Sequence, residues 1–258
     1  MKEIIRKIYW LLSFQFGFDP RRLARSFRGI PRYVAGWFRF RKGYKGHIDF
    51  LPCLHDWYEE GGSTKDEYFW QDLHVARQIH LANPARHVDI GSRIDGFVAH
   101  VASFREIEVF DIRPVAAQIP GVIFRKADLM KPTGKLAECC DSLSCLHALE
   151  HFGLGRYGDP IDPYGYAAGL DNMSRLLQPE GLFYLSVPIG EERVEFNAHR
   201  IFDPHSLVQL AAANGLRLRE FAWIESNRAL ILSSSPEQDM EELGKLRYAL
   251  GIFTFIKQ

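Results

Sequence analysis

From residue 87 onward, short apolar segments of the length of buried strands alternate with longer segments that have the apolar spacing of helices. Helical spacing falls at 95–104 and 164–177. A further helix is expected between Asp203, which can cap its first turn, and Gly215, which suits its end. Strands joined through helices form a mostly parallel sheet covered on both faces, so we predict an α/β protein. The expected strands are 87–91, 107–112, 122–129, 142–146, 181–188, 217–224 and 229–233. Only a short turn separates the last two, which predicts an antiparallel edge.

The length of the chain limits the number of domains. Its 258 residues are enough for one large α/β domain with a full core and too few for two. We place this domain at residues 85–258. A segment at 47–84 precedes it, and the 66–81 part of that segment has helical spacing suited to packing on a sheet. Residues 1–46 form a separate extension, expected to be helical in pieces.

Charge is unevenly distributed along the chain. The whole sequence is neutral, with 32 basic and 32 acidic residues, but residues 1–46 hold twelve basic residues and two acidic ones. Eleven aromatic residues accompany these cations. Three hypotheses stay open for this extension: a helical cap packed on the acidic remainder of the chain, weak contact with an anionic membrane surface, or, least favoured, nucleic acid.

The cysteines and the hydropathy bear on location. Cys53, Cys139, Cys140 and Cys145 form no CxxC pair, which suits reduced thiols in a cytosolic protein. No apolar run is long enough to span a bilayer, and the apolar stretch 8–18 lacks a cleavage site of the signal-peptide type. We expect a cytoplasmic protein, at most peripheral at the inner face of the membrane.

The residues that follow each strand are the candidates for ligand binding, because ligands of such sheets lie at the carboxyl ends of the strands. Gly91 would allow a tight turn against a cofactor. Asp111 could accept hydrogen bonds from both hydroxyls of a ribose, and Asp128 could accept one from an adenine amino group beside the apolar Leu129. The candidate cofactor-binding residues are Asp89, Gly91, Ser92, Arg93, Gly96, Asp111, Ile112, Asp128, Leu129 and Leu146.

The order of these segments resembles a known family. Six segments are similar to the motif succession of class I, Rossmann-like methyltransferases that use S-adenosylmethionine (SAM). In chain order they are HVDIGS, VFDI, ADL, LSCLHALEH, LLQPEGLFYLSVP and HRIFDPHSLVQLAAANG. The resemblance covers about residues 85–235 and is closest to the branch that modifies small molecules and quinone precursors. More narrowly, the chain resembles a family catalogued as a domain of unknown function in the segments DIGSRIDGFVAH, LEHFGLGRYGDPIDP and FNAHRIFDP. Members of that family look like methyltransferases and are often associated with surface-polysaccharide clusters.

The resemblance implies SAM as the cofactor and S-adenosylhomocysteine (SAH) as a product. It also implies O-methylation of a polar small molecule or glycan. The chain departs from the family pattern at Arg93 and Asp95, which stand where the first loop usually carries glycines. This departure keeps two alternatives open: the same fold with another nucleotide cofactor, and a non-catalytic scaffold. A G-x-G-x-x-G fingerprint is absent, which counts against a dehydrogenase.

The segment HALEH follows the fourth strand and carries the candidate acid–base residues. In a helix, His147 and His151 would share one face, and Glu150 could orient one of them. An imidazole titrates near neutrality and can take the proton of an acceptor hydroxyl. His199, after the fifth strand, is a further candidate. Two alternatives are that these residues bind a metal, for which no further ligand is evident, and that they only pack or cap a helix.

A loop rich in glycine, proline and carboxylates, residues 153–163, is the candidate acceptor lid. Arg156, Tyr157, Asp159 and Asp162 could bind the hydroxyls of a sugar-like acceptor. The alternative is a rigid surface turn.

Overall fold

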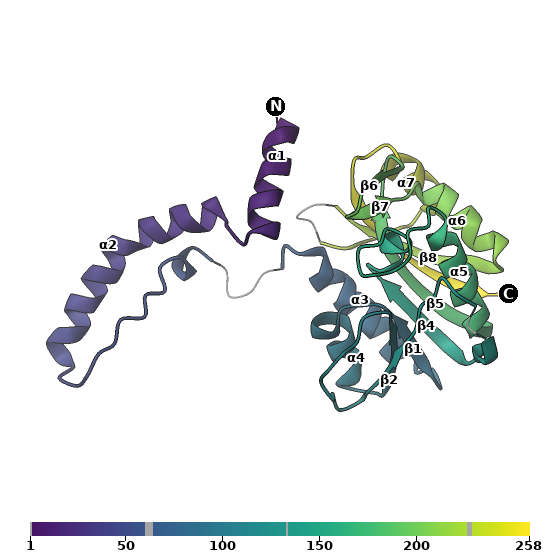
Figure 1. Ribbon diagram of the computed structural model, residues 1–258, viewed down its shortest axis with the longest axis horizontal. Helices are drawn as coiled ribbons and strands as arrows, with labels where there is room; N and C mark the ends of the chain where they lie inside the picture. Colours follow the sequence, from purple (N-terminus) through teal and green to yellow (C-terminus); the bar gives the residue numbers. More distant parts are fainter. Residues whose placement is uncertain (1, 60–63, 133, 226–228) are drawn as a thin grey trace. The chain divides into compact units, whose positions relative to one another are not determined.

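Apolar strands at the expected places build one eight-stranded sheet. The computed structural model describes residues 2–59, 64–132, 134–225 and 229–258. The chain divides into two units, Met1–Ser63 and Thr64–Gln258, which we describe separately. The strands found among these residues all belong to the second unit (Figure 1).

The first strands of the sheet are parallel and follow the predicted segments. β1 (His87–Ile90) lies between β2 (Ile107–Asp111) and β4 (Cys140–Leu146), β3 (Val122–Lys126) pairs with β2, and β5 (Leu177–Ile189) pairs with β4. The full order is β3-β2-β1-β4-β5-β10-β8-β9. The reversal of strand order between β1 and β4 brings the carboxyl ends of β1, β2 and β4 to the edge where ligands bind in such sheets.

The other half of the sheet contains a strand that the sequence analysis did not predict. β10 (Ala249–Lys257) inserts between β5 and β8 (Leu216–Ile224) and is antiparallel to both. The predicted antiparallel edge is present: Ala222 pairs with Leu232 of the short β9 (Ile231–Leu232). The α/β prediction, with a mostly parallel sheet and an antiparallel edge, is therefore confirmed, and an internal antiparallel strand is added to it.

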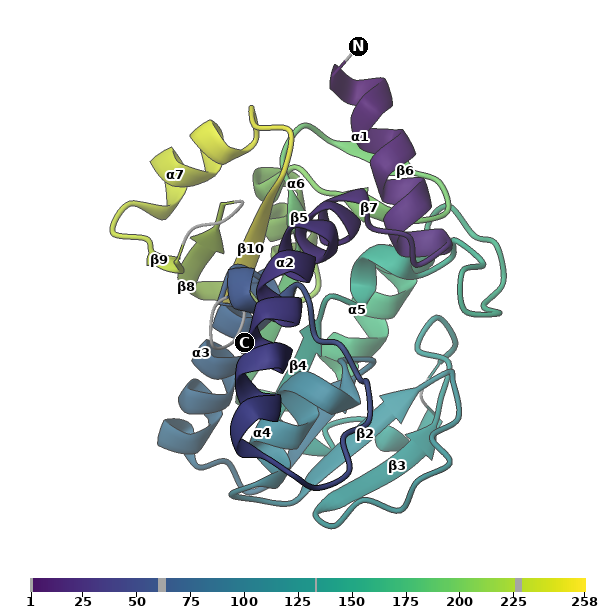
Figure 2. The same cartoon turned by 90° about the vertical axis from the view of Figure 1, so that its left-hand side faces the viewer.

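Helices cover both faces of the sheet (Figures 1 and 2). On one face, α3 (Glu67–Ala82), the π-helical turn Ile94–Val98 and α4 (Ala99–Ala102) pack on strand residues such as Ile107, Val109 and Tyr184. On the other face, α5 (Gly165–Leu176), α6 (Pro204–Ala213) and α7 (Pro236–Leu243) pack on residues such as Leu143 and Leu185. Alternate residues of a strand point to opposite faces, so the sheet is apolar on both sides.

The predicted helix signals are present in the structure. Asp203 accepts a hydrogen bond from the backbone N–H of Ser206 at the start of α6, and Gly215, with φ +74°, follows its end. Asp66 accepts one from the N–H of Tyr68 at the start of α3. After β5 the chain forms a small hairpin from β6 (Arg193–Glu195) and β7 (His199–Ile201).

The first unit is built around two helices. α1 (Lys2–Trp10) continues into a π-helical turn, Leu11–Gln15, and α2 (Pro20–Gly43) begins after Asp19, which accepts a hydrogen bond from the N–H of Arg21. A 3₁₀ turn, Asp56–Tyr58, follows in the chain. Within the described residues, no helix is both long and apolar enough to cross a membrane.

Candidate functional site

Asp89, at the end of β1, anchors the loop that follows. Its fully buried carboxylate accepts hydrogen bonds from Ser144 Oγ at 2.6 Å, Ser92 Oγ at 2.6 Å and the N–H of Ser92 at 3.0 Å. Burial raises the pKa of Asp89 to about 6, although these donors act in the opposite direction. Asp89 therefore fixes the turn after β1 against β4, so its carboxylate is already occupied by protein donors.

The loops after β1 and β4 are joined directly. Gly91 has φ +71°, a conformation that favours glycine, and a side chain there would meet the Cβ of Ala148 at 3.1 Å. Ser92 Oγ accepts the N–H of Leu146 at 3.1 Å. Of the predicted cofactor residues, Gly91, Ser92 and Leu146 are thus brought together at the strand ends, where Ser92 and Leu146 are buried.

The glycine-poor part of the first loop is held by an ion pair. Arg93 Nη2 lies 2.7 Å from Asp95 Oδ2, and the guanidinium lies 5.1 Å from the ring centroid of Tyr68 on α3. A Cβ at Gly96 would overlap the carboxylate of Asp72, also on α3. Gly96 is therefore needed for close packing of α3 on this loop, and Arg93 extends along the same helix.

Asp111 ends β2 and is paired with a nearby arginine. Its Oδ2 accepts Arg113 Nη2 at 2.7 Å, and its Oδ1 accepts the backbone N–H of Arg113 at 2.7 Å. The Arg113 guanidinium also lies 4.3 Å from the ring centroid of Tyr157, in the candidate acceptor loop. Through Arg113, Asp111 is connected to that loop. Ile112 follows it and is half-buried.

Asp128 follows β3 at a short distance, because the strand ends at Lys126 rather than at the predicted residue 129. Asp128 Oδ1 accepts the N–H of Met130 at 3.1 Å, and Lys131 Nζ lies 3.3 Å from Oδ2. Leu129 is buried beside it.

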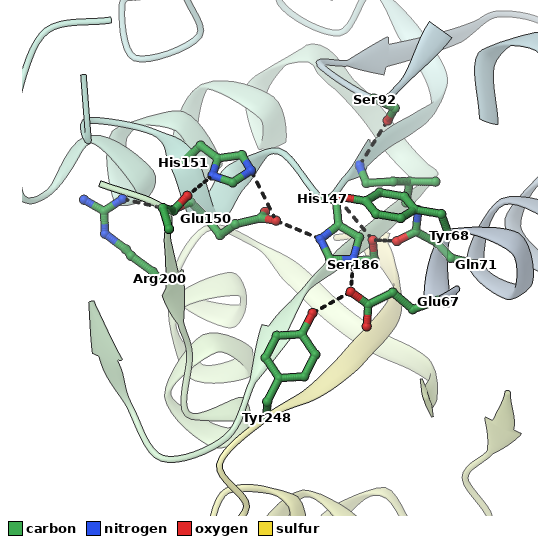
Figure 3. Close-up of polar contacts among 12 residues, drawn as sticks. Glu67, Tyr68, Gln71, Ser92, His147, Glu150, His151, Ser186, Arg200 and Tyr248 are labelled. Carbon is green, nitrogen blue, oxygen red and sulfur yellow. Dashed lines mark hydrogen bonds and ion pairs between the residues drawn. The ribbon is translucent and has the colours of Figure 1, made fainter. Parts of the chain in front are cut away.

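His147 lies between two carboxylates (Figure 3). Its Nδ1 is 2.9 Å from Glu150 Oε1, and its Nε2 is 3.3 Å from Oε1 of Glu67, on α3. The hydroxyl of Tyr248 donates to the same Glu67 oxygen at 2.6 Å, and the Tyr68 ring lies 4.6 Å from the imidazole. Burial alone would lower the pKa of His147, but Glu150 and Glu67 outweigh it and raise the pKa to about 10. His147 is therefore an imidazolium at neutral pH.

His151 has the opposite electrostatic setting. Its Nδ1 lies 2.8 Å from the carbonyl oxygen of Ala198, and its Nε2 lies 3.7 Å from Glu150 Oε1. Burial lowers the pKa of His151, and the charge of Arg156 lowers it further, against the effect of Glu150. A neutral imidazole with Nδ1–H donating to the carbonyl leaves Nε2 as the acceptor nitrogen.

His199, on β7, lies 3.6 Å from Glu195 Oε2 through its Nε2, and its ring is 6.3 Å from the ring of Tyr248. Burial lowers the pKa of His199 as well. The structure thus places one cationic and two less basic histidines in the same region, whereas the sequence placed His147 and His151 together ahead of His199 and did not separate the first two.

The candidate acceptor loop is held from within. Asp159 Oδ2 accepts the N–H groups of Gly153 and Gly155 at 2.9 and 3.1 Å, and Asp162 Oδ1 accepts that of Tyr164 at 2.9 Å. Both carboxylates have internal partners. Arg156 donates through Nη1 to the carbonyl oxygen of Ala198 at 2.8 Å, so the rest of its guanidinium and Tyr157 are the groups of this loop better suited to meet a ligand.

A buried arginine supports the same loop from outside. The guanidinium of Arg200 donates to the carbonyl oxygens of Glu150 and Phe152, and at 3.2 Å to that of Pro163. Arg200 therefore joins β7, the HALEH turn and the far end of the loop. This role was not predicted.

Further residues of the site come from elements that sequence reasoning did not connect to it. Ser186 on β5 accepts the N–H of His147 at 3.2 Å and donates to Gln71 on α3. Glu67 lies in the first turn of α3, and Tyr248 directly precedes β10. An acidic residue in the first turn of a helix is common because it stabilises the helix dipole. The residues around Glu67 in the sequence therefore do not indicate that it belongs to the site.

The described residues contain one group with metal-ligand spacing, and the HALEH residues are not part of it. His55, Asp56 and Glu59 of the first unit have ligand atoms within 4.8 Å of one another. Arg22 Nε already donates to His55 Nε2 at 2.9 Å. This group therefore does not bear on whether the HALEH residues bind a metal.

Comparisons with known proteins agree with this topology. The family model described as "Caenorhabditis protein of unknown function, DUF268" matches residues 121–250. The sequence has no match among curated proteins. A 1,6-didemethyltoxoflavin-N1-methyltransferase from Burkholderia thailandensis, solved with 1,6-didemethyltoxoflavin and SAH, is a similar structure: TM-score 0.53, 16% identity, 93% of this chain and 91% of that chain.

Two further structures have similar folds. The N-methyltransferase NodS from Bradyrhizobium japonicum WM9, in complex with SAH, has a TM-score of 0.51 and 11% identity over 75% of this chain and 89% of that chain. The [4+2]-cyclase SpnF has a TM-score of 0.50 and 14% identity over 72% and 85%. At these identities the likeness shows the fold, which is that of class I SAM-dependent methyltransferases. The fold also hosts other chemistry.

Proposed function

Since this chain belongs to the DUF268 family and has the class I methyltransferase fold, we propose that it is a SAM-dependent methyltransferase. The observation that best supports this proposal is that Gly91 and Asp111 lie side by side. Gly91 has left-handed backbone geometry after β1, and Asp111 ends the neighbouring strand β2. On a parallel sheet this is where a nucleoside ligand binds. The structures of the Burkholderia thailandensis methyltransferase and of NodS both contain SAH, which supports the same cofactor for this chain.

The residues present fit this cofactor. Asp111 Oδ2 accepts one hydrogen bond from Arg113, which leaves a lone pair for a ribose hydroxyl. Asp128 and Leu129 would border the adenine, and the backbone of Gly91 would lie along the methionine portion. SAM supplies an electrophilic methyl group. The protein has to hold the acceptor in line with it and remove the acceptor's proton.

We assign the proton-accepting role to His151, with His199 as the second candidate. A base has to be neutral before it acts, and the raised pKa of His147 argues against that residue. His147 instead fixes Glu150, whose Oε2 is buried and has no hydrogen-bond partner among the described residues. A buried carboxylate oxygen without a donor suits an acceptor hydroxyl. This supports O-methylation of a polar small molecule or glycan, with Arg156 and Tyr157 of the loop as contacts.

Titration calorimetry with SAH tests the cofactor proposal. We expect Asp111→Ala to weaken binding by about 10–100-fold, which corresponds to losing hydrogen bonds to a charged acceptor. The control is Asp171→Ala, which removes a carboxylate of α5 that also pairs with an arginine, Arg175, at 2.9 Å. Equal affinities of the wild type and the Asp111 variant would remove Asp111 from the site. A wild type that does not bind SAH would refute the proposal.

Formation of SAH with a panel of hydroxylated acceptors tests the catalytic assignment. His151→Gln should lower turnover by about 10²–10⁴-fold at nearly unchanged SAH affinity. His80→Gln, an exposed histidine of α3, is the control. Full turnover in both the His151 and His199 variants would exclude histidine as the base.

The Arg93–Asp95 pair in the first loop, together with the likeness to a [4+2]-cyclase, favours one alternative: the same fold used without methyl transfer. Tight SAH binding without SAH formation from any acceptor would support that alternative.

A further inference from the structure

We infer that α2 binds to an anionic lipid surface through an apolar stripe on one side of the helix. The stripe consists of Leu23, Phe27, Ile30, Val34 and Phe38, which follow the spacing of one face of a helix. All five side chains are exposed, Phe27 at 63% and Phe38 at 57%. Large apolar side chains in such a continuous exposed row indicate an interaction surface.

The opposite side of α2 is cationic. Five arginines follow the spacing of one face of the helix, and this face lies opposite the stripe. They are Arg21, Arg25, Arg28, Arg32 and Arg39. α2 contains eight basic residues and no acidic one. Among the described residues, no carboxylate lies within ion-pair distance of any of them. A helix with an apolar face, a basic face and aromatic residues has the composition of one that lies in the plane of a membrane interface.

The segment that follows α2 contacts the arginine side of the helix and one edge of its apolar side, where Phe50 stacks on Trp37 at 5.6 Å between ring centroids. In Figures 1 and 2 the chain after α2 runs back along the helix. Gly29 is the only buried residue of α2, and a Cβ there would overlap the carbonyl of Leu54. Arg22 donates to His55 at 2.9 Å, and Arg28 lies 5.2 Å from the ring centroid of Tyr58. The returning segment therefore organises the cationic side and leaves the five stripe residues exposed.

An anionic lipid surface accommodates both sides of this helix at once. The stripe would enter the boundary between headgroups and acyl chains, while the long arginine side chains reach the phosphates. A protein surface that covered the stripe would leave the arginines without anionic partners. Single-stranded nucleic acid fits less well, because it requires cations and stacking rings along one groove, and here they lie on opposite sides.

Co-sedimentation of the full-length protein with vesicles tests this inference. We expect binding to vesicles of equal parts phosphatidylcholine and phosphatidylserine, and much weaker binding to phosphatidylcholine alone. Raising the salt from about 0.1 M to about 0.5 M should weaken the binding by shortening the screening length. Phe27→Ser should weaken it about tenfold, as expected for losing the burial of one aromatic side chain.

Leu51→Ser is the matched control, since Leu51 is an exposed apolar residue of the same unit outside the stripe, and it should change binding little. Phe38→Ser serves as a second stripe variant if Phe27→Ser alters the helix content measured by circular dichroism. The double variant Arg25→Gln, Arg39→Gln should lose the preference for phosphatidylserine. A wild type that ignores anionic vesicles at low salt would overturn the inference. So would a dimer in light scattering that Phe27→Ser dissociates, because the stripe would then be a contact between two copies.

Discussion

Because His147 is cationic, we expect the free energy of unfolding to depend on pH in the alkaline range. The imidazole is 6% exposed and has carboxylates on both sides, Glu150 at 2.9 Å and Glu67 at 3.3 Å. Replacing it by glutamine in His147→Gln removes the charge and leaves two carboxylates in a buried region. We expect this variant to be destabilised at neutral pH and to lose a pH dependence that the wild type has.

The magnitude follows from the pKa of His147, which rises from 6.5 to about 10 on folding. Each pKa unit corresponds to about 1.4 kcal/mol, so the full shift corresponds to about 5 kcal/mol. Because the folded pKa is the higher one, this stabilisation is complete below pH 6.5 and is lost as the pH rises through about 10. At pH 7 about 4 kcal/mol of it is still present.

Urea unfolding at a series of pH values measures this contribution. Between about pH 7.5 and 9.5, the contribution of His147 to the wild-type free energy of unfolding should fall by about 1.4 kcal/mol per pH unit, because the folded state holds the imidazole proton and the unfolded state does not. His147→Gln should lack this slope. The control, His199→Gln, removes a histidine whose pKa is lowered and should keep it. Parallel curves for wild type and His147→Gln in this range would refute a cationic His147.

Three further predictions concern the acceptor loop and the base. Gly153 has φ +77°, and a Cβ there would overlap the carbonyl of Asp162, so Gly153→Ala should cost about 2 kcal/mol or more of unfolding free energy. Gly158→Ala, with positive φ but open space, should cost less in the same urea titration. Arg200→Leu removes a donor shared by the partly buried carbonyls of Phe152 and Pro163 and should lower stability by about 3 kcal/mol, and limited proteolysis should then cleave within 153–163. If His151 is the base, kcat/KM should fall on acidification with a midpoint below pH 6.5, since the lowered pKa keeps the imidazole neutral down to that range; a midpoint above 7 would contradict the assignment.

The elements of the fold could be predicted where local chemistry determines them. Asp203 and Gly215 mark the ends of α6 because capping is a property of adjacent residues. β10 was missed, although its residues are strongly apolar. A short apolar run carries no signal for its direction or its neighbours, and the position of β10 depends on pairing with β5, far away in the chain.

The site shows the same limit. Asp89 and Asp111 could be recognised as residues at strand ends, but their environments could not. The partners of Asp89 include Ser144, from another strand. The charge of His147 depends on Glu67, which is distant in sequence and is brought near by the packing of α3. A pKa set by contacts between distant residues cannot be read from spacing, and for this reason His147 could not be distinguished from His151 as the base.

The place of β10 in the sheet has a consequence for biosynthesis. Until residues 249–257 have left the ribosome, β5 and β8 each keep an unpaired edge, because both pair with β10. Exposed apolar edges recruit strands of other chains, so the nascent protein passes through a period in which it is prone to aggregate. Chaperones that hold unfolded chains should therefore matter most in the interval between the release of β8 and the release of β10. Substitutions in β10 should reduce the yield of folded protein more than the activity of the molecules that do fold.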